Sequence, residues 1–121
     1  MCPAFQELAR RVLELFDRTV DRVEHDLQMI RARRFRLQPC LRDVWHDHIL
    51  FTGDEVTGLI DASACRTENI ASDLARLIGS LAGDDRSAWD AALSEYSKER
   101  SLGLDEMALV QVLDRSGVLL S

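Results

Sequence analysis

The sequence predicts a mostly helical α+β fold, and the spacing of its apolar residues leads to that prediction. Apolar residues recur every three or four positions, the period of an amphipathic helix, over four stretches. These stretches are approximately residues 3–34, 69–81, 85–96 and 105–120. Residues 49–51 and 56–60 are β-type runs on either side of the turn-rich tetrapeptide 52–55, a pattern that predicts a β-hairpin. The 121 residues are enough for one domain with a modest core.

The first predicted helix is long and carries one apolar stripe. Its stripe consists of Phe5, Leu8, Val12, Phe16, Val20, Val23, Leu27 and Ile30. Pro3 suits a first helical turn, where its missing N–H costs nothing. Four arginines follow the stripe: Arg31, Arg33, Arg34 and Arg36. They either pair favourably with the negative end of the helix dipole or contact phosphate near the segment that follows.

Candidate capping and turn residues mark the ends of the remaining predicted elements. A short extended segment is expected over residues 37–41. Thr67 is a candidate N-cap for the second helix, and Gly83 lies just beyond its end. Asp84 or Asp85 can cap the third helix.

The composition excludes several classes of protein. A hydrophobic content of 46%, a charged content of 30% and a net charge of −6 are typical of a globular protein with no general affinity for nucleic acid or anionic membranes. Three cysteines without a CxxC pair give no zinc ribbon or disulfide framework. The N-terminus does not read as a signal peptide, and no run of about 18 apolar residues occurs. We therefore expect a cytoplasmic protein with neither nucleic-acid nor membrane partners.

Residues that could carry chemistry gather between Leu41 and Asp61. They are Asp43, His46, Asp47, His48 and Asp61. If residues 46–48 are extended, the two imidazoles point to the same side, as they would to bind one metal ion. Carboxylates at loop starts and strand ends are typical ligands of hard cations. The alternative is that all five are solvated loop residues.

The spacing in this segment resembles a known family. Leu41-Arg42-Asp43 is followed by His48 five positions after the aspartate, and then by a hairpin whose second run ends at Asp61. This is similar to the aminoglycoside phosphotransferase family, part of the protein-kinase-like superfamily, whose hallmark is His-Gly-Asp-x4-Asn, a hairpin, and a strand ending in Asp. Residues 72–77 also resemble the Asp-Leu-Ala helix of that family. The resemblance runs from about Phe5 to the end and implies part of a C-terminal lobe.

The resemblance implies a role for each matching residue. Asp43 matches the catalytic aspartate, which orients the attacking hydroxyl or accepts its proton, and Asp61 matches the aspartate that holds Mg²⁺ on ATP. His48 stands where the family has a second metal ligand, normally Asn, and an imidazole there suits Mn²⁺ or Zn²⁺ better than Mg²⁺. Further candidate contacts to substrate or phosphate are Arg42, Trp45 and His46.

The departures from the family pattern limit what this chain is expected to do alone. Leu41 and Arg42 replace the motif's His and Gly, no GxGxxG or GxxxxGK[ST] occurs, and the one lysine, Lys98, lies downstream of Asp61. We therefore expect residues 1–121 to be a single partial domain without the N-terminal nucleotide-binding lobe. The domain would transfer a phosphoryl group from ATP to a small-molecule hydroxyl, but this isolated chain would be incomplete or inactive.

Two alternatives follow from the same residues. The chain can be a degenerate, non-catalytic interaction module that associates through Phe5, Phe16 and Val20 and binds neither Mg²⁺ nor nucleotide. It can also be a divalent-metal domain built from Asp43, His46 and His48. The sequence does not name a substrate.

Overall fold

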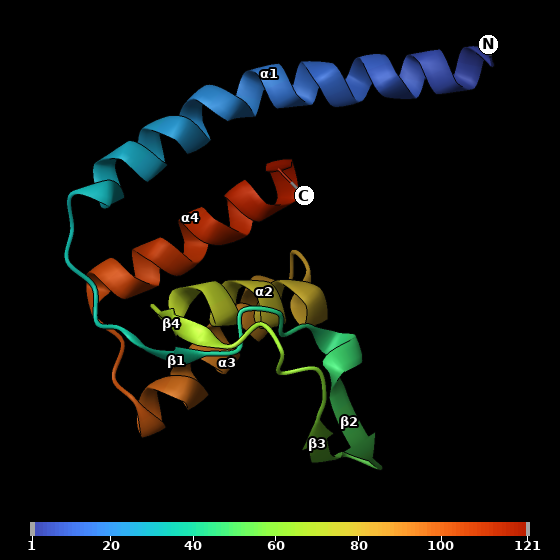
Figure 1. The fold of residues 1–121 in the computed structure, drawn as a ribbon. Coiled ribbons are helices and arrows are strands. Elements are labelled where there is room, and N and C mark those ends of the chain that lie inside the picture. Colours follow the sequence, from blue (N-terminus) through green and yellow to red (C-terminus); the bar gives the residue numbers. More distant parts are fainter. Residues whose placement is uncertain (1, 121) are drawn as a thin grey trace.

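The computed structural model describes residues 2–120 and shows the mostly helical α+β class that the sequence predicts (Figure 1). Within residues 2–120, four helices and four short strands follow one another. In order they are α1 (Pro3–Arg31), β1 (Gln38–Cys40), the 3-10 turn η1 (His46–His48), β2 (Ile49–Thr52), β3 (Glu55–Leu59), β4 (Arg66–Glu68), α2 (Ala71–Ala82), α3 (Arg86–Glu99) and α4 (Leu104–Leu120). No helix in this described stretch is long and apolar enough to cross a membrane.

The strands form two separate antiparallel pairs. β2 and β3 make the predicted hairpin, with Thr52 opposite Glu55 and a positive φ of 60° at Gly53 in the turn. β1 pairs with β4, which places Cys40 opposite Arg66. β4 is a polar Arg-Thr-Glu segment with no β-type pattern, so the sequence did not predict it. This second pair closes the loop that carries the candidate site.

The helix bounds agree with the predicted ones to within three residues, and one predicted cap is wrong. α1 ends at Arg31, three residues before the predicted end. The predicted N-cap Thr67 is wrong, because Thr67 lies in β4; the Asn69 side-chain carbonyl instead accepts a hydrogen bond from the Ala71 N–H at 2.9 Å. Gly83 ends α2 with a φ of 50°, and Asp85 caps α3 by accepting from two backbone N–H groups.

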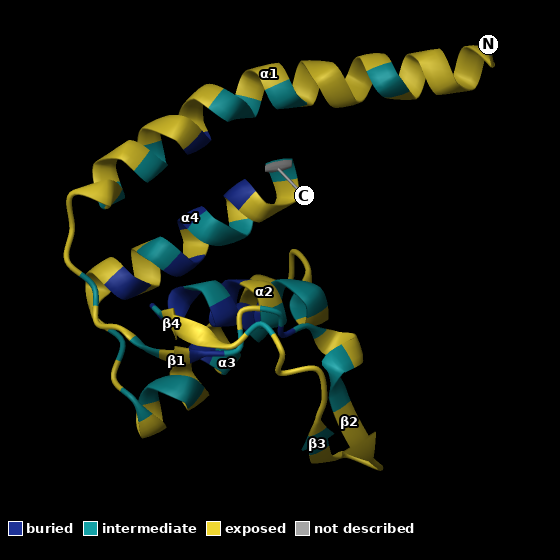
Figure 2. Ribbon diagram, in the orientation of Figure 1, coloured by how far each residue is buried: buried dark blue, intermediate teal, exposed yellow. Residues whose placement is uncertain are grey.

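The core forms around α2. Buried positions concentrate on α2 and on the side of α4 that faces it (Figure 2). Val110 of α4 is fully buried, and Trp89 and Leu93 of α3 pack into the same cluster with Ile78. α2 is therefore the buried central element against which the loop before β2 is held.

The apolar stripe of α1 is buried only toward its C-terminal end. Val23 is 7% exposed and lies where α1 packs against α4, and Asp26 pairs there with Arg115 at 3.3 Å. Phe5 is 60% exposed and Val12 57%, because the N-terminal half of α1 extends beyond the other described elements (Figure 1).

Candidate metal and phosphate site

The loop that carries Asp43 is fixed to α2 by one buried carboxylate. Asp73, in the first turn of α2, is 7% exposed. One of its oxygens accepts the Leu41 N–H at 2.7 Å, and the other accepts the Arg42 N–H at 2.8 Å. Hydrogen bonds to an ionised acceptor are stronger than neutral ones. Asp73 therefore sets the position of the backbone immediately before Asp43.

Two residues at the site have left-handed backbone conformations. Arg42 has a φ of 66° and Asp61 a φ of 58°, and the structure describes no other non-glycine residue with a positive φ. This region is unfavourable for most L-residues by about 1–2 kcal/mol, with aspartate among the more tolerant. Arg42 occupies the motif position where the family has glycine, which adopts this conformation freely. Such strain concentrates at functional sites.

Asp43, His48 and Asp61 come together in space. One potential ligand atom from each lies within 4.8 Å of the others. Asp43 and His48 are half-buried and Asp61 is exposed, with its Oδ1 accepting the Ser63 hydroxyl at 2.8 Å. The Ile60 N–H donates to the His48 carbonyl at 3.0 Å, which extends the hairpin pairing up to the residue before Asp61. The hairpin thus returns Asp61 to the start of the loop.

Both ring nitrogens of His48 are hydrogen-bonded. Nδ1 lies 2.7 Å from the carbonyl oxygen of Asp43, and Nε2 lies 3.0 Å from the indole N–H of Trp45. A carbonyl accepts only, so Nδ1 carries the proton and Nε2 has the lone pair. A metal-binding histidine commonly donates its second N–H to a backbone carbonyl in this way.

His46 lies apart from the three converging residues. Residues 46–48 form the 3-10 turn η1 and are not extended, so the condition for two imidazoles on one side is not met. The His46 ring lies 3.2 Å from Asp47, and its backbone N–H donates to Ser80 Oγ at 3.0 Å. In the described part of the chain, the group that converges is Asp43, His48 and Asp61, and His46 is not part of it.

Two arginines lie beside the loop. Arg42 Nε is 2.8 Å from a Glu68 carboxylate oxygen. An Arg76 guanidinium nitrogen lies 3.1 Å from the Arg42 carbonyl and 3.6 Å from Asp43 Oδ1. Sequence reasoning did not assign roles to Asp73 or Arg76. The Asp-Leu-Ala match was the signal that could have found both, since Arg76 follows Asp73 by one helical turn.

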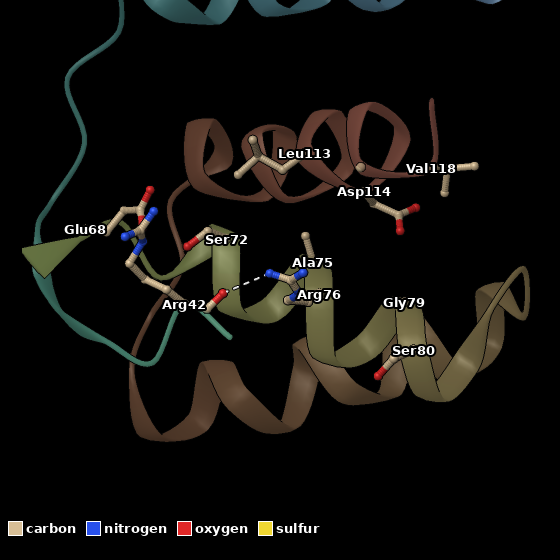
Figure 3. A pocket seen from close by; sticks show the side chains of 11 residues that line it. Arg42, Glu68, Ser72, Ala75, Arg76, Gly79, Ser80, Leu113, Asp114 and Val118 are labelled. Atoms are coloured by element: carbon tan, nitrogen blue, oxygen red, sulfur yellow. Dashed lines mark hydrogen bonds and ion pairs between the residues drawn. The ribbon is translucent and has the colours of Figure 1, made fainter. Parts of the chain in front are cut away.

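A cavity of about 520 Å³ lies between α2 and α4, next to these arginines (Figure 3). Arg42 and Arg76 line it, while Asp43, His48 and Asp61 do not. The view shows Arg42 beside Glu68 on one side of the cavity and Asp114 on the other. Burial raises the pKa of Asp114 above its usual range, although Arg86 partly offsets this. The cavity is thus lined by two arginines and two carboxylates, with the Arg42–Glu68 pair on one side and Asp114 on the other.

Comparison with known proteins gives two matches of different extent. The family described as "Phosphotransferase enzyme family" matches residues 2–110. A homoserine kinase of Rhodopseudomonas palustris is 32% identical over 82 residues, which are 64% of this chain and 25% of that protein. This chain thus covers about a quarter of that relative's length. No solved structure matches. A family match over residues 2–110 shows that this chain belongs to the phosphotransferase enzyme family.

Proposed function

We propose that this chain supplies the catalytic loop and the metal-binding residues of an ATP-dependent phosphotransferase that acts on a small-molecule hydroxyl. The observation that carries the proposal is the convergence of Asp43, His48 and Asp61 within 4.8 Å, in a chain of this family. Residues 1–121 would form a single partial domain equivalent to part of the C-terminal lobe. The coverage of about a quarter of a kinase relative supports that assignment.

Asp43 is proposed to position the acceptor hydroxyl and to take its proton. Its carboxylate is half-buried, and its backbone is held by the neighbouring Asp73 contacts. Arg76 lies 3.6 Å from it and restricts its orientation. Precise placement of a base and a nucleophile contributes most of what a protein supplies in phosphoryl transfer. A half-buried aspartate on a fixed loop meets this requirement.

Asp61, His48 and one carboxylate oxygen of Asp43 are proposed to hold a divalent cation, which leaves the second Asp43 oxygen for the acceptor hydroxyl. Two carboxylates and a neutral imidazole with an anchored Nδ1–H form a donor set that fits such an ion. When bound, the cation would neutralise charge on the phosphates of ATP. The carboxylates suit Mg²⁺, and the imidazole also permits Mn²⁺.

The acceptor is proposed to be a small hydroxylated amino acid. This class of acceptor is suggested by the name of the relative, homoserine kinase. The cavity beside the loop supports it, because Arg42 and Arg76 can face a carboxylate group and Asp114 can face an ammonium group.

Calorimetry with Mg²⁺–ATP tests the proposal. We expect weak binding to the native chain that is lost in Asp61→Asn and retained in Asp54→Asn. Asp54 is a matched control because it is an exposed aspartate in the hairpin turn. Binding that is equal in all three proteins, or missing from the native chain, would refute the metal assignment.

The exposed half of α1 favours a second candidate, a helical module that self-associates without binding nucleotide. Phe5 and Leu8 are each 60% exposed and Val12 is 57% exposed, all on the predicted apolar stripe. Burying such side chains favours association. This candidate predicts a dimer in sedimentation experiments that dissociates in Val12→Glu. A monomer at all concentrations would exclude it.

A further inference from the structure

Trp45 occupies the one lone pair that His48 could offer to a metal ion. We propose that Trp45 is a specificity-determining residue of the site. Its indole N–H donates a hydrogen bond to His48, which we call the latch, and a cation that takes His48 as a ligand must first break this hydrogen bond. The inference rests on the proposed metal site formed by Asp43, His48 and Asp61. It adds a residue that neither the family motif nor the convergence of the three ligands assigns.

The hydrogen bonds of His48 define the latch. The Asp43 carbonyl, 2.7 Å from Nδ1, keeps the ring proton on that nitrogen. The remaining lone pair is on Nε2, which accepts the Trp45 indole N–H at 3.0 Å. An indole nitrogen only donates, so this contact always uses the lone pair. One lone pair cannot serve an N–H donor and a cation at the same time.

Of the two bonds, the one to Trp45 is the one that can open. The Asp43 carbonyl belongs to a backbone that Asp73 fixes through two hydrogen bonds of 2.7 and 2.8 Å. Trp45 is a half-buried side chain immediately before η1, where its backbone is extended. Its ring meets the rings of His46 and His48 edge-on, at centroid distances of 5.2 and 5.3 Å. Rotation of the indole frees Nε2 without moving the loop.

The latch changes which metal the site prefers. Mg²⁺ prefers oxygen ligands and gains little from an imidazole, so Asp43 and Asp61 can hold it while the latch stays closed. Zn²⁺ binds imidazole well, but here it must break the bond between Trp45 and His48. Trp45 therefore shifts the preference toward Mg²⁺ and partly offsets the presence of histidine at this position.

Nuclear magnetic resonance of the two indole N–H groups tests the latch directly in the full chain. Cys2 and Cys65 are exposed thiols and would be changed to serine so that they do not bind Zn²⁺. Trp89 is the internal control, because its indole N–H donates to the Gly83 carbonyl at 2.8 Å inside the core. Saturating Zn²⁺ should move the Trp45 signal and leave that of Trp89 in place, and Mg²⁺ should move neither. A Trp45 signal that is unmoved by bound Zn²⁺ would overturn the proposal.

Calorimetry separates failure of the latch from failure of the site. In the same background, Trp45→Phe keeps an aromatic ring but removes the donor, and it should raise Zn²⁺ affinity by roughly three- to tenfold with little change for Mg²⁺. His48→Asn should weaken Zn²⁺ binding and remove the effect of Trp45→Phe. If His48→Asn and Asp61→Asn weaken binding while Trp45→Phe does not strengthen it, the latch is wrong and the site stands. If none of the three changes alters binding, the proposed site itself is wrong.

Discussion

At the scale of single residues, Asp73 supports the candidate site without being one of its proposed ligands. It is 7% exposed and accepts two backbone N–H groups from the loop that carries Asp43. In Asp73→Asn one carboxylate oxygen becomes an NH₂ group, which leaves one part-buried backbone N–H facing a donor. An unsatisfied buried donor costs about 1–3 kcal/mol.

We therefore expect Asp73→Asn to lower the free energy of unfolding by about 1–3 kcal/mol, and to weaken metal binding because the loop loses its anchor. Urea unfolding and calorimetry would measure the two effects. Asp90→Asn, an exposed change on α3, is the matched control and should alter neither. An Asp73→Asn protein as stable as the native chain would show that the loop does not depend on α2.

The sequence could identify individual site residues only where a motif fixed their spacing. Asp43, His48 and Asp61 were found from spacing, and the structure brings them together. His46 was grouped with them because local reasoning assumed an extended segment, whereas residues 46–48 form a turn. The contact between Asp73 and the loop joins residues 32 apart, so the Asp-Leu-Ala match could mark Asp73 but not its partner in the loop.

At the scale of elements, one buried glutamate joins the segment after α1, the start of α2 and the turn before α4. Glu106 accepts hydrogen bonds from Arg36 at 2.6 Å, Asn69 at 3.0 Å, and Arg100 and the Gly103 N–H at 3.1 Å. Burial alone would raise the pKa of Glu106, but these hydrogen bonds outweigh it and lower the pKa from 4.5 to about 2. A lowering of this size corresponds to roughly 3 kcal/mol.

This shift predicts a pH dependence with a definite sign. The folded pKa is depressed, so the stabilisation from Glu106 is complete above about pH 4.5 and is lost as the pH falls toward 2. Glu106→Gln should lower the free energy of unfolding by about 3 kcal/mol at pH 7, and the difference should shrink between pH 4.5 and 2. Urea unfolding across this range measures it. Glu95→Gln, an exposed glutamate paired with Lys98, should change stability by less than about 0.5 kcal/mol throughout.

The two halves of α1 should respond differently to the same substitution. Val23 packs against α4 and is 7% exposed, whereas Val12 is 57% exposed. Val23→Ala should cost roughly 1–3 kcal/mol of unfolding free energy, and Val12→Ala less than about 0.5 kcal/mol. Thermal or urea unfolding compares them. Equal costs would show that the first half of α1 is also packed, as it would be in a dimer.

Elements were predictable to the extent that their signals are local. The helices, the hairpin, Gly83 and Asp85 follow from periodicity and capping chemistry. β4 was missed because the polar segment 66–68 becomes a strand only by pairing with β1, far away in sequence. Thr67 was predicted to be a cap because the pairing with β1, which places it in a strand, is likewise invisible in the local sequence.

At the scale of the whole molecule, the mostly helical class follows from the sequence, but the way the parts pack does not. Which half of the α1 stripe is buried depends on where α4 lies, and α4 is the described element farthest from α1 in sequence. The cavity between α2 and α4 likewise arises from packing and has no sequence pattern of its own. The site, by contrast, is assembled from one short segment, residues 41–61, held on α2.

The central claim is that this segment forms one divalent-cation site from Asp43, His48 and Asp61. Electron paramagnetic resonance of Mn²⁺ counts bound ions directly and needs neither nucleotide nor turnover. We predict one bound Mn²⁺ per chain, lost in Asp43→Asn and in Asp61→Asn. Asp47→Asn, which removes a neighbouring carboxylate paired with His46, should retain it. Mn²⁺ that remains bound in Asp43→Asn and Asp61→Asn, or that is absent from the native chain, would contradict the claim.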